Sequence, residues 1–252
     1  MKIPILALDG KQKGETSLGK AFSTPVRTDI IKRAFLAEAA ARRQPYGTDP
    51  LAGKRTSAHY HGLRHYRYTM MNREMARMTR IHSQGYLNYT ARIVPQAIKG
   101  REAHPPLVER NWKLKVNKKE RRMALLSALA ATAAKEFTSP RYTGAVPIVL
   151  EDGFQKLTKT KDVVAVVRAL GLVAGSRSIR AGRGKTRGRK YRSQTGPLFI
   201  VKEGPVLRAA PPGCDVLAFK DVDMHVLAPG GRPGRLCVWT ESALKEAEAL
   251  AK

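Results

Sequence analysis

The stretch "AVPIVLEDGFQKLTKTKDVVAVVRALG", residues 145–171, predicts a strand followed by a helix. Residues 145–152 are a short apolar run that ends in two carboxylates, which is typical of a strand buried on both faces. Residues 160–171 follow as a helix that Gly171 closes. A strand that leads into a helix in this way favours a parallel sheet.

Three more apolar strands and a helix follow in the same half of the chain. The strands are "GPLFIVKEG" (196–204), "CDVLAFKDV" (214–222) and "GRLCVWT" (234–240), and "TESALKEAEALAK" is a terminal helix capped by Thr240 or Ser242. Short apolar strands interleaved with helices indicate an α/β fold. We expect a three-layer α/β/α sandwich on a mostly parallel sheet.

The N-terminal part predicts one strand and two helices. "MKIPILALDG" indicates a strand that ends in an Asp-Gly turn, and 24–43 a helix that begins near Thr28. A second helix is expected over 117–137, with Asn117 at its N-cap and Glu120 at the capping-box position. These elements complete the predicted α/β domain.

Between the two helices, from Gln44 to about Lys115, ordinary periodicity fades and Gly and Pro punctuate the chain. About 70 residues without a core pattern are far more than an ordinary loop contains. Methionines at helical spacing indicate one short helix within 68–82, which packing alone would explain. We therefore expect a single globular domain, 1–45 and 110–252, with residues 46–109 as a long extended basic loop inserted between its first two helices.

Charge is the strongest compositional signal. The chain has 47 Lys and Arg against 20 Asp and Glu, a formal net charge of +27. Residues 42–122 hold 19 of the basic and five of the acidic residues, and residues 175–192 hold eight basic residues and no acidic one. Such clusters repel themselves unless a polyanion neutralises them, and nucleic acid is the polyanion that fits.

Other classes of protein are disfavoured. No apolar run approaches the roughly 20 residues that span a bilayer, and the N-terminus has too short an apolar run for a signal peptide. Cys214 and Cys237 lack metal-ligand spacing and imply no disulfide framework, which fits an intracellular compartment. We expect no cofactor.

"RAGRGKTRGRKYR", 180–192, contains Gly184-Lys185-Thr186 but is not a nucleotide cradle. A Walker A loop needs a glycine at position 179, where this chain has isoleucine, and a following helix, where a strand is expected. The glycines of 228–236 also miss the dinucleotide spacing and indicate a turn into the last strand.

His59, His61 and His65 form a cluster of imidazoles that allows two interpretations. A metal site is one, but no cysteine or carboxylate accompanies them and arginines surround them. Stacking on unpaired RNA bases is the other, and we favour it; no metal ligands are predicted.

Paired carboxylates at two predicted strand ends allow an enzymatic function as an alternative. Glu151 and Asp152, and Asp221 and Asp223, lie where α/β enzymes place catalytic groups. An α/β nuclease or RNA-modifying enzyme is therefore the alternative to an RNA-binding protein. No His or Lys partner stands out and no nucleophile elbow is present, so no catalytic residue is predicted.

Several motifs, in this order, make the chain resemble the large-subunit ribosomal protein four family, in its archaeal and eukaryotic branch. They are "LAGKRTSA" (51–58), "RIVPQAIKGREAHPP" (92–106), "ERRMALLSALAATA" (120–133), "RAGRGKTRGRKYR" (180–192), "LAPGGRPGRL" (227–236) and "TESAL" (240–244). The chain ends after its last predicted helix, which favours the archaeal branch.

The resemblance implies a structural, non-enzymatic rRNA-binding protein of the large ribosomal subunit in the cytoplasm, which supports subunit assembly. It implies that the loop of residues 46–109 penetrates the rRNA and helps form the nascent-peptide exit tunnel, opposite a protein of the L-twenty-two family. The tip departs from the Gly/Arg-rich pattern of the family, and we expect His65–Arg80 to come nearest the nascent peptide.

Residues expected to contact RNA share a basic or imidazole side chain and lie in the two basic segments. They are Lys54, Arg55, His59, His61, Arg64, Arg67, Arg73, Arg77, Arg80, Arg92, Lys99, Arg101, His104, Arg177, Arg180, Arg183, Lys185, Arg187, Arg189, Lys190 and Arg192.

Overall fold

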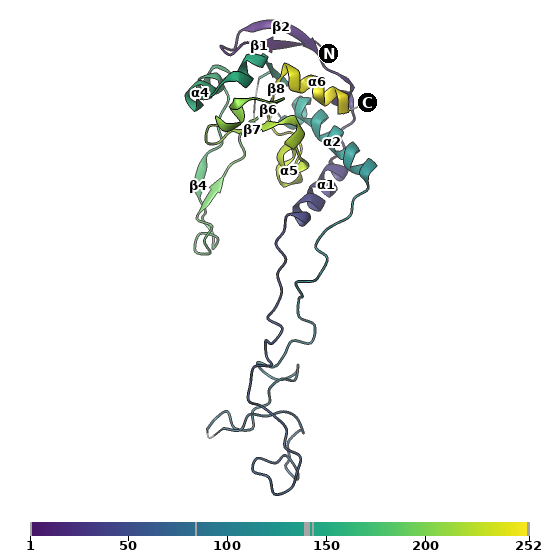
Figure 1. Ribbon diagram of the computed structural model, residues 1–252, viewed down its shortest axis with the longest axis vertical. Coiled ribbons are helices and arrows are strands. Elements are labelled where there is room, and N and C mark those ends of the chain that lie inside the picture. Colours follow the sequence, from purple (N-terminus) through teal and green to yellow (C-terminus); the bar gives the residue numbers. More distant parts are fainter. Residues whose placement is uncertain (1, 84, 139–141, 143, 251–252) are drawn as a thin grey trace. The chain divides into compact units, whose positions relative to one another are not determined.

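The computed structural model describes residues 2–83, 85–138, 142 and 144–250, and the chain divides into two compact units (Figure 1). One unit comprises residues 1–42 and 113–252, which we call the α/β unit. The other comprises residues 43–112, which we call the insertion.

A six-stranded sheet of order β2-β1-β3-β8-β6-β7 forms the centre of the α/β unit. All its pairs are parallel except β1 with β2. The strands are β1 (Lys2–Leu6), β2 (Gln12–Ser17), β3 (Ile148–Leu150), β6 (Leu198–Val201), β7 (Asp215–Ala218) and β8 (Cys237–Thr240).

The three adjacent strands β3, β8 and β6 are buried at every position, as in a parallel sheet covered on both faces. The last strand in the chain, β8, lies between the other two: Val149 is opposite Trp239, and Trp239 is opposite Ile200. The continuous apolar runs seen in the sequence therefore are the centre of the sheet.

Helices connect the strands and lie against the sheet (Figure 1). The α-helices are α1 (Thr28–Ala41), α2 (Lys118–Ala133), α3 (Lys135–Thr138), α4 (Thr160–Ala169), α5 (Met224–Leu227) and α6 (Glu241–Leu250). Short 3-10 turns are η1 (Lys20–Ser23), η2 (Asp152–Lys156), η3 (Pro205–Arg208), η4 (Phe219–Asp221) and η5 (Pro229–Gly231).

Two apolar clusters lie on opposite sides of the sheet, because side chains alternate along each strand. One joins Trp239 to α1, α2, α5 and α6, and the Phe22 ring meets the indole edge-on at a centroid distance of 5.3 Å. The other joins the neighbouring Val238 to α4, η2 and η3, where the rings of Phe154 and Phe199 stack at 5.1 Å. Mostly parallel α/β architecture is thus confirmed.

Element positions agree closely with those predicted from sequence. The helix expected near Thr28 begins there, the four C-terminal strands and helix 160–171 are present, and Gly10 has φ +79° in the turn that follows β1. The end of the terminal helix at residues 251–252 lies outside the described residues.

The N-cap position predicted for α2 is confirmed, whereas the side-chain contacts at the starts of α2 and α6 differ from those of a capping box. Asn117 does occupy the N-cap of α2, but its side chain makes no capping hydrogen bond, and Glu120 instead pairs with Arg33 of α1 at 3.0 Å. At α6, Asp152 accepts hydrogen bonds from the backbone N–H of Ser242 at 3.0 Å and from its hydroxyl at 2.8 Å. An acid from a neighbouring loop therefore satisfies the N-terminus of α6.

No α-helix or named strand forms among the described residues of the insertion, so the helix expected within 68–82 is wrong. Tyr68 and Asn72 have φ of 63° and 55°, which breaks a helical turn. The amide of Met70 donates to the carbonyl of His61 at 2.9 Å, and that of Arg80 to His59 at 3.1 Å. Backbone donors that a helix would use are therefore bonded to other segments.

The close contact between Gly196, just before β6, and Gly213 predicts an effect of substitution on stability. A Cβ at Gly196 would lie 1.8 Å from the carbonyl oxygen of Gly213, whereas one at Gly182 would meet nothing within 4 Å. We expect Gly196→Ala to lower the free energy of unfolding by about 1–3 kcal/mol. Gly182→Ala should change it by less than about 0.5 kcal/mol. Urea unfolding followed by circular dichroism measures both, and equal effects would contradict the packing.

Candidate nucleic-acid interface

A two-stranded antiparallel hairpin presents the second basic segment. It consists of β4 (Arg177–Ile179) and β5 (Tyr191–Ser193), and Arg177 lies opposite Ser193. The amide of Arg180 donates to the carbonyl of Lys190 at 2.9 Å and extends the pairing toward the turn. Sequence analysis assigned no strand to this segment, and each of the two strands is only three residues long.

Every predicted RNA-contacting residue of this hairpin is exposed, and none forms an ion pair within the described part of the chain. The Arg177 guanidinium lies 3.9 Å from the centroid of the Tyr191 ring, and Arg180 donates to the Tyr191 carbonyl at 3.1 Å. These contacts orient two cations without neutralising them. The full set is Arg177, Arg180, Arg183, Lys185, Arg187, Arg189, Lys190 and Arg192.

Within the insertion, two segments far apart in sequence lie side by side. The amide of Thr48 donates to the carbonyl of Pro106 at 2.9 Å, and a Cβ at Gly53 would lie 2.3 Å from the carbonyl oxygen of Gly100. Gly53 also has φ +74°, so both space and backbone angle require glycine here. These are the two basic arms, 51–58 and 92–106, that sequence motifs singled out.

Exposed cations are spread along this insertion. Exposed among the predicted contacts are Lys54, Arg55, His59, Arg64, Arg67, Arg73, Arg77, Lys99 and His104, whereas His61, Arg80, Arg92 and Arg101 are half-buried.

Arg55, Arg80 and Arg92 have ion-pair or hydrogen-bond partners among the described residues of the insertion, and Arg67 and Arg73 lie over tyrosine rings. Arg55 pairs with the carboxylate of Asp49 at 2.5 Å. Arg80 donates to the carbonyls of Tyr89 at 2.7 Å and Ala76 at 2.9 Å, and Arg92 donates to that of Ile98 at 3.0 Å. Arg80 and Arg92 therefore hold the fold of the insertion as well as adding charge to it.

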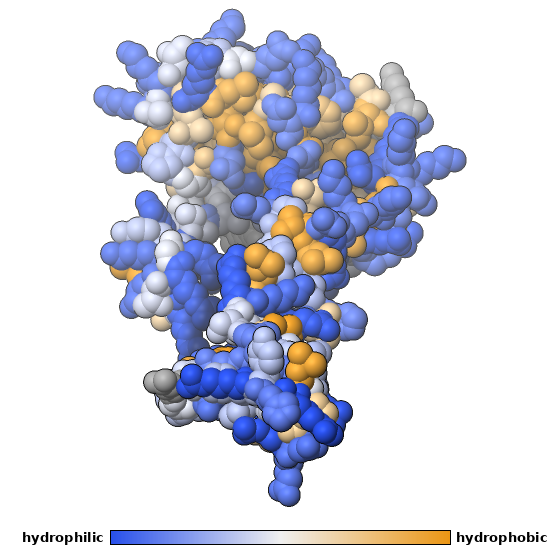
Figure 2. Space-filling model, turned by 60° about the horizontal axis from the view of Figure 1, so that its bottom comes forward, coloured by the Kyte–Doolittle hydropathy of each residue, from blue (hydrophilic) through white to orange (hydrophobic). Residues whose placement is uncertain are grey.

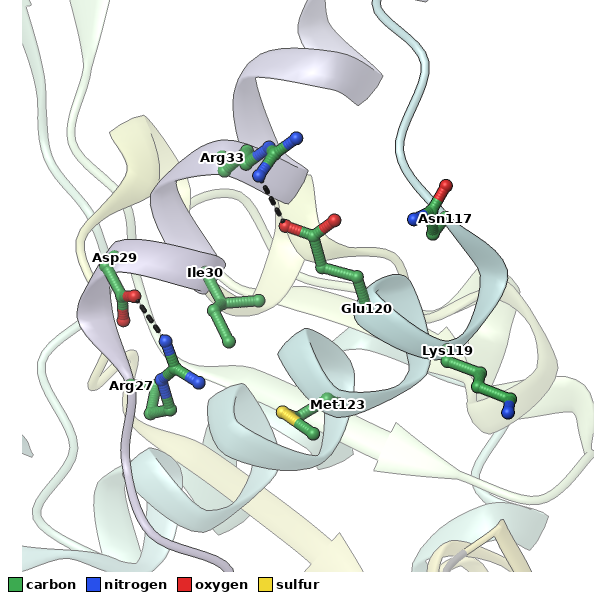
Figure 3. A pocket seen from close by; sticks show the side chains of 8 residues that line it. All are labelled: Arg27, Asp29, Ile30, Arg33, Asn117, Lys119, Glu120 and Met123. Carbon is green, nitrogen blue, oxygen red and sulfur yellow. Dashed lines mark hydrogen bonds and ion pairs between the residues drawn. The ribbon is translucent and has the colours of Figure 1, made fainter.

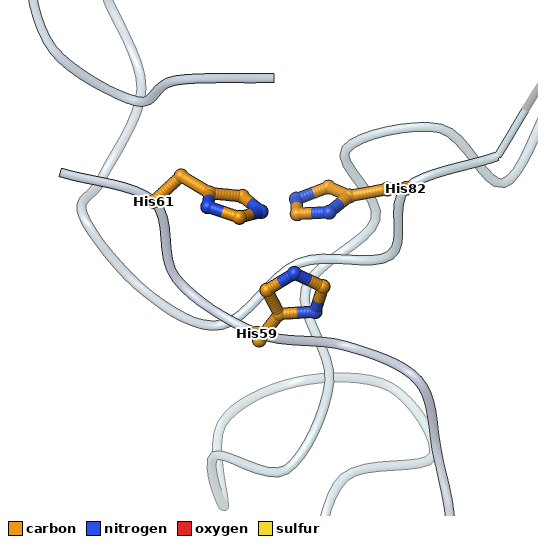
Figure 4. A group of neighbouring side chains, drawn as sticks. All are labelled: His59, His61 and His82. Atoms are coloured by element: carbon orange, nitrogen blue, oxygen red, sulfur yellow. The ribbon is translucent and has the colours of Figure 1, made fainter. Parts of the chain in front are cut away.

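The histidine cluster differs from the predicted one. Structure brings His59 and His61 together with His82, which sequence reasoning missed, and His65 is not a member (Figure 4). The His59 and His82 rings have centroids 4.4 Å apart, and those of His61 and His82 lie at 4.5 Å. Burial lowers the pKa of His82, and the neighbouring imidazoles lower it further.

The strand-end carboxylates serve structural contacts. Glu151 pairs with Lys13 at 2.5 Å, and that hydrogen bond holds the pKa of Glu151 below its usual range, whereas a general acid at neutral pH needs a raised one. Asp152 caps α6, and Asp223 pairs with Arg42 at 2.5 Å. The arrangement gives no support to an enzyme.

A surface hollow of about 560 Å³ between α1 and α2 is no better as an active site (Figure 3). Arg27 pairs with Asp29 at 2.7 Å and Arg33 with Glu120 at 3.0 Å, so its acids are used by its own arginines. Ile30 and Met123 complete the lining from the two helices. The Arg33–Glu120 pair joins α1 to α2, whereas the Arg27–Asp29 pair lies at the start of α1.

Arg235, in the "GGRPGRL" motif, has a role that composition could not indicate. It is only 3% exposed, donates to the carbonyls of Gly196 at 3.1 Å and Val226 at 3.0 Å, and pairs with Asp215. Its guanidinium therefore ties the starts of β6 and β7 to α5. This basic residue belongs to the interior rather than to the interface.

The face seen in Figure 2 is mostly hydrophilic, and its apolar side chains form several separate patches. None of the helices in the described ranges has the length and apolarity needed to cross a bilayer. The positive charge of the molecule therefore favours electrostatic binding of an anionic partner.

Comparison with known proteins gives a consistent result. Residues 16–250 match the model of the family described as "Ribosomal protein L4/L1 family". Relatives named "Large ribosomal subunit protein uL4" include that of Methanocaldococcus jannaschii at 45% identity and that of Haloquadratum walsbyi at 43%, each over 98% of both chains. That of Archaeoglobus fulgidus is 42% identical over 97% of both chains.

Exposure of the insertion predicts its sensitivity to protease. Tyr86 is 94% exposed, and the insertion lacks a helix or strand among its described residues. In the RNA-free chain we expect chymotrypsin to cut first within residues 43–112, because locally open backbone is cleaved before buried sheet and helix. Mass spectrometry of early fragments tests this. First cuts within 118–138 or 148–250 would contradict it.

Proposed function

The chain belongs to the ribosomal protein L4/L1 family, and on this basis we propose that it is a structural constituent of the large ribosomal subunit. This family is structural and not enzymatic, and its work is to bind rRNA beside other ribosomal proteins in the cytoplasm. The hairpin 177–192, with eight exposed cations and no acid, is the observation that carries the rRNA-binding role.

Hairpin and insertion would bind rRNA by different means. The hairpin is tied by its glycine-lined base to β6, so it would present fixed cations to packed phosphates. Lys54, Lys99 and the exposed arginines of the insertion would neutralise phosphates along a segment that has little apolar core of its own. Assembly of the subunit would draw on both, because neutralised phosphates allow RNA helices to approach one another.

We further propose that residues 46–109 act as an extended loop that penetrates the rRNA and helps form the nascent-peptide exit tunnel. Six non-glycine residues between His65 and Lys99 have φ from 55° to 71°, and such backbone persists where surroundings hold it. A protein of the L-twenty-two family would lie opposite, and His65–Arg80 would come nearest the nascent peptide. The two core clusters support reading the α/β unit as a three-layer α/β/α sandwich.

Salt dependence tests the hairpin directly. Replacing Arg183, Lys185, Arg187 and Arg189 by Ala should weaken rRNA binding and flatten the plot of log K against log salt by about 3 units, because each lost phosphate contact removes about 0.7–0.9. The matched control replaces four paired cations, Lys13, Arg27, Lys220 and Lys245, which have acidic partners.

Both quadruple variants lose the same net charge, so general electrostatics predicts equal effects. Filter binding from low to high salt separates the two cases. Equal slopes of log K against log salt for the two variants would contradict the assignment of the hairpin as an rRNA contact.

Sedimentation of a cell lysate from the source organism tests the ribosomal role as a whole. We expect an antibody against the chain to find it almost entirely in the large-subunit and 70S-type fractions. Chelating Mg²⁺ to dissociate subunits should leave it with the large one. Detection mainly at the top of the gradient would contradict the proposed function.

A further inference from the structure

The triad of His59, His61 and His82, which we call the histidine triad, has the geometry of a metal site. One ligand atom from each lies within 4.8 Å of the other two. Figure 4 shows a ring nitrogen of each directed toward a common point. Imidazole nitrogens around a tetrahedral zinc ion lie about 3.3 Å apart, given Zn–N bonds of about 2.0–2.1 Å, so small ring rotations would close the site.

Backbone pairing explains why His59 and His82 meet. His59 and Arg80 form an antiparallel bridge, with hydrogen bonds of 3.2 and 3.1 Å between their backbones. His82 is therefore diagonal to His59 across the bridge. His61 joins them through ring contacts, at centroid distances of 4.3 Å to His59 and 4.5 Å to His82. The second bridge, Arg80 with Ala91, fixes the same segment from its other edge.

Hydrogen bonding leaves the required nitrogens free. His59 Nδ1 lies 2.8 Å from the carbonyl oxygen of Ser57, to which it would donate, so Nε2 keeps its lone pair. A backbone carbonyl on the second ring nitrogen is the usual support of a metal-binding histidine. His82 Nε2 is buried and has no hydrogen-bond partner in the described structure, which a metal ion would provide.

Aromatic neighbours fix the ring planes. Tyr68 lies parallel to His82 at 4.9 Å and 4°, and Tyr66 lies over His61 at 5.2 Å and 25°. The nearest bridged arginine, Arg80, directs its guanidinium to the carbonyls of Tyr89 and Ala76, so its charge is engaged elsewhere. Two neutral tyrosine rings thus flank the triad, and the Arg67 guanidinium lies over Tyr68, 5.0 Å from its ring centroid.

We propose that the histidine triad binds one zinc ion. Imidazole suits zinc, and three protein ligands leave a fourth tetrahedral position for an exchangeable ligand such as water. The ion would join the segment of His59 and His61 to that of His82, and would stabilise an insertion that has no helix or strand among its described residues. This role is independent of the proposed rRNA contacts and revises the predicted use of His59 and His61.

Zinc titration of the purified, metal-free full-length chain tests the proposal, with a chromophoric chelator as competitor. We expect one equivalent to bind, and each of His59→Ala, His61→Ala and His82→Ala to weaken binding at least about 10-fold. His65→Ala and His104→Ala are matched controls from the same insertion and should bind as the unaltered chain does. Circular dichroism verifies that every variant keeps the α/β unit.

Cobalt substitution supplies a second measurement. Co²⁺ in the unaltered chain should give the visible absorption of a tetrahedral site with nitrogen ligands, and excess Zn²⁺ should abolish it. Zinc should also slow chymotrypsin cleavage of the insertion in the unaltered chain and in His65→Ala, but not in His82→Ala. No saturable zinc binding, or equal loss in the control variants, would overturn the proposal.

Discussion

Burial of β8 between β3 and β6 is the constraint on which the α/β unit depends. This four-residue strand comes last in the chain and is completely buried, with Trp239 at its centre. Its indole packs edge-on against Phe22, from the other end of the sequence. The sheet is therefore complete only when strands from both ends of the chain have come together. The long insertion between α1 and α2 is then a loop that folding has to close.

The packing of α1 against α2 offsets the cost of closing this loop. Ile30, Ile31 and Ala34 of α1 lie in one cluster with Ala124 and Ala128 of α2. The helices are further joined by the Arg33–Glu120 ion pair, whose exposed arginine adds little beyond packing. Closing a long loop costs free energy that grows only slowly with its length, so a well-packed pair of helices can hold its two ends.

The α/β unit could be predicted from the sequence because buried strands and helices have recognisable patterns of apolar residues. The continuous apolar runs of β3, β6 and β8 could only be inner strands of a covered sheet, and Gly171, with φ +63°, closes α4 as expected. Prediction failed where local pattern and tertiary contact disagree. Met71, Met75 and Met78 recur at helical spacing within 68–82 and indicated a helix, but Met70 is the methionine of this segment that is buried, at 1% exposure.

The histidine triad and Arg235 were missed for a related reason. His82 joins His59 only through the antiparallel return of the chain at Arg80, and no spacing in the sequence encodes that return. In the sequence Arg235 cannot be told from the other cations of a basic chain. In the structure it is buried and its guanidinium donates to three acceptors. Composition counts charges but does not say which of them fold the protein.

The placement of charge shows how folding and RNA binding are separated in this chain. In the α/β unit, Glu151, Asp215 and Glu203 each pair with a cation, so part of the positive charge of that unit is neutralised within it. Hairpin 177–192 has no acid at all, and its fold rests on backbone pairing and on the Arg177–Tyr191 contact, neither of which removes charge. The insertion has little apolar core and only four acids against twelve Lys and Arg. Under the two proposals, rRNA phosphates would neutralise its cations and a zinc ion would join its segments, so its order would depend on both.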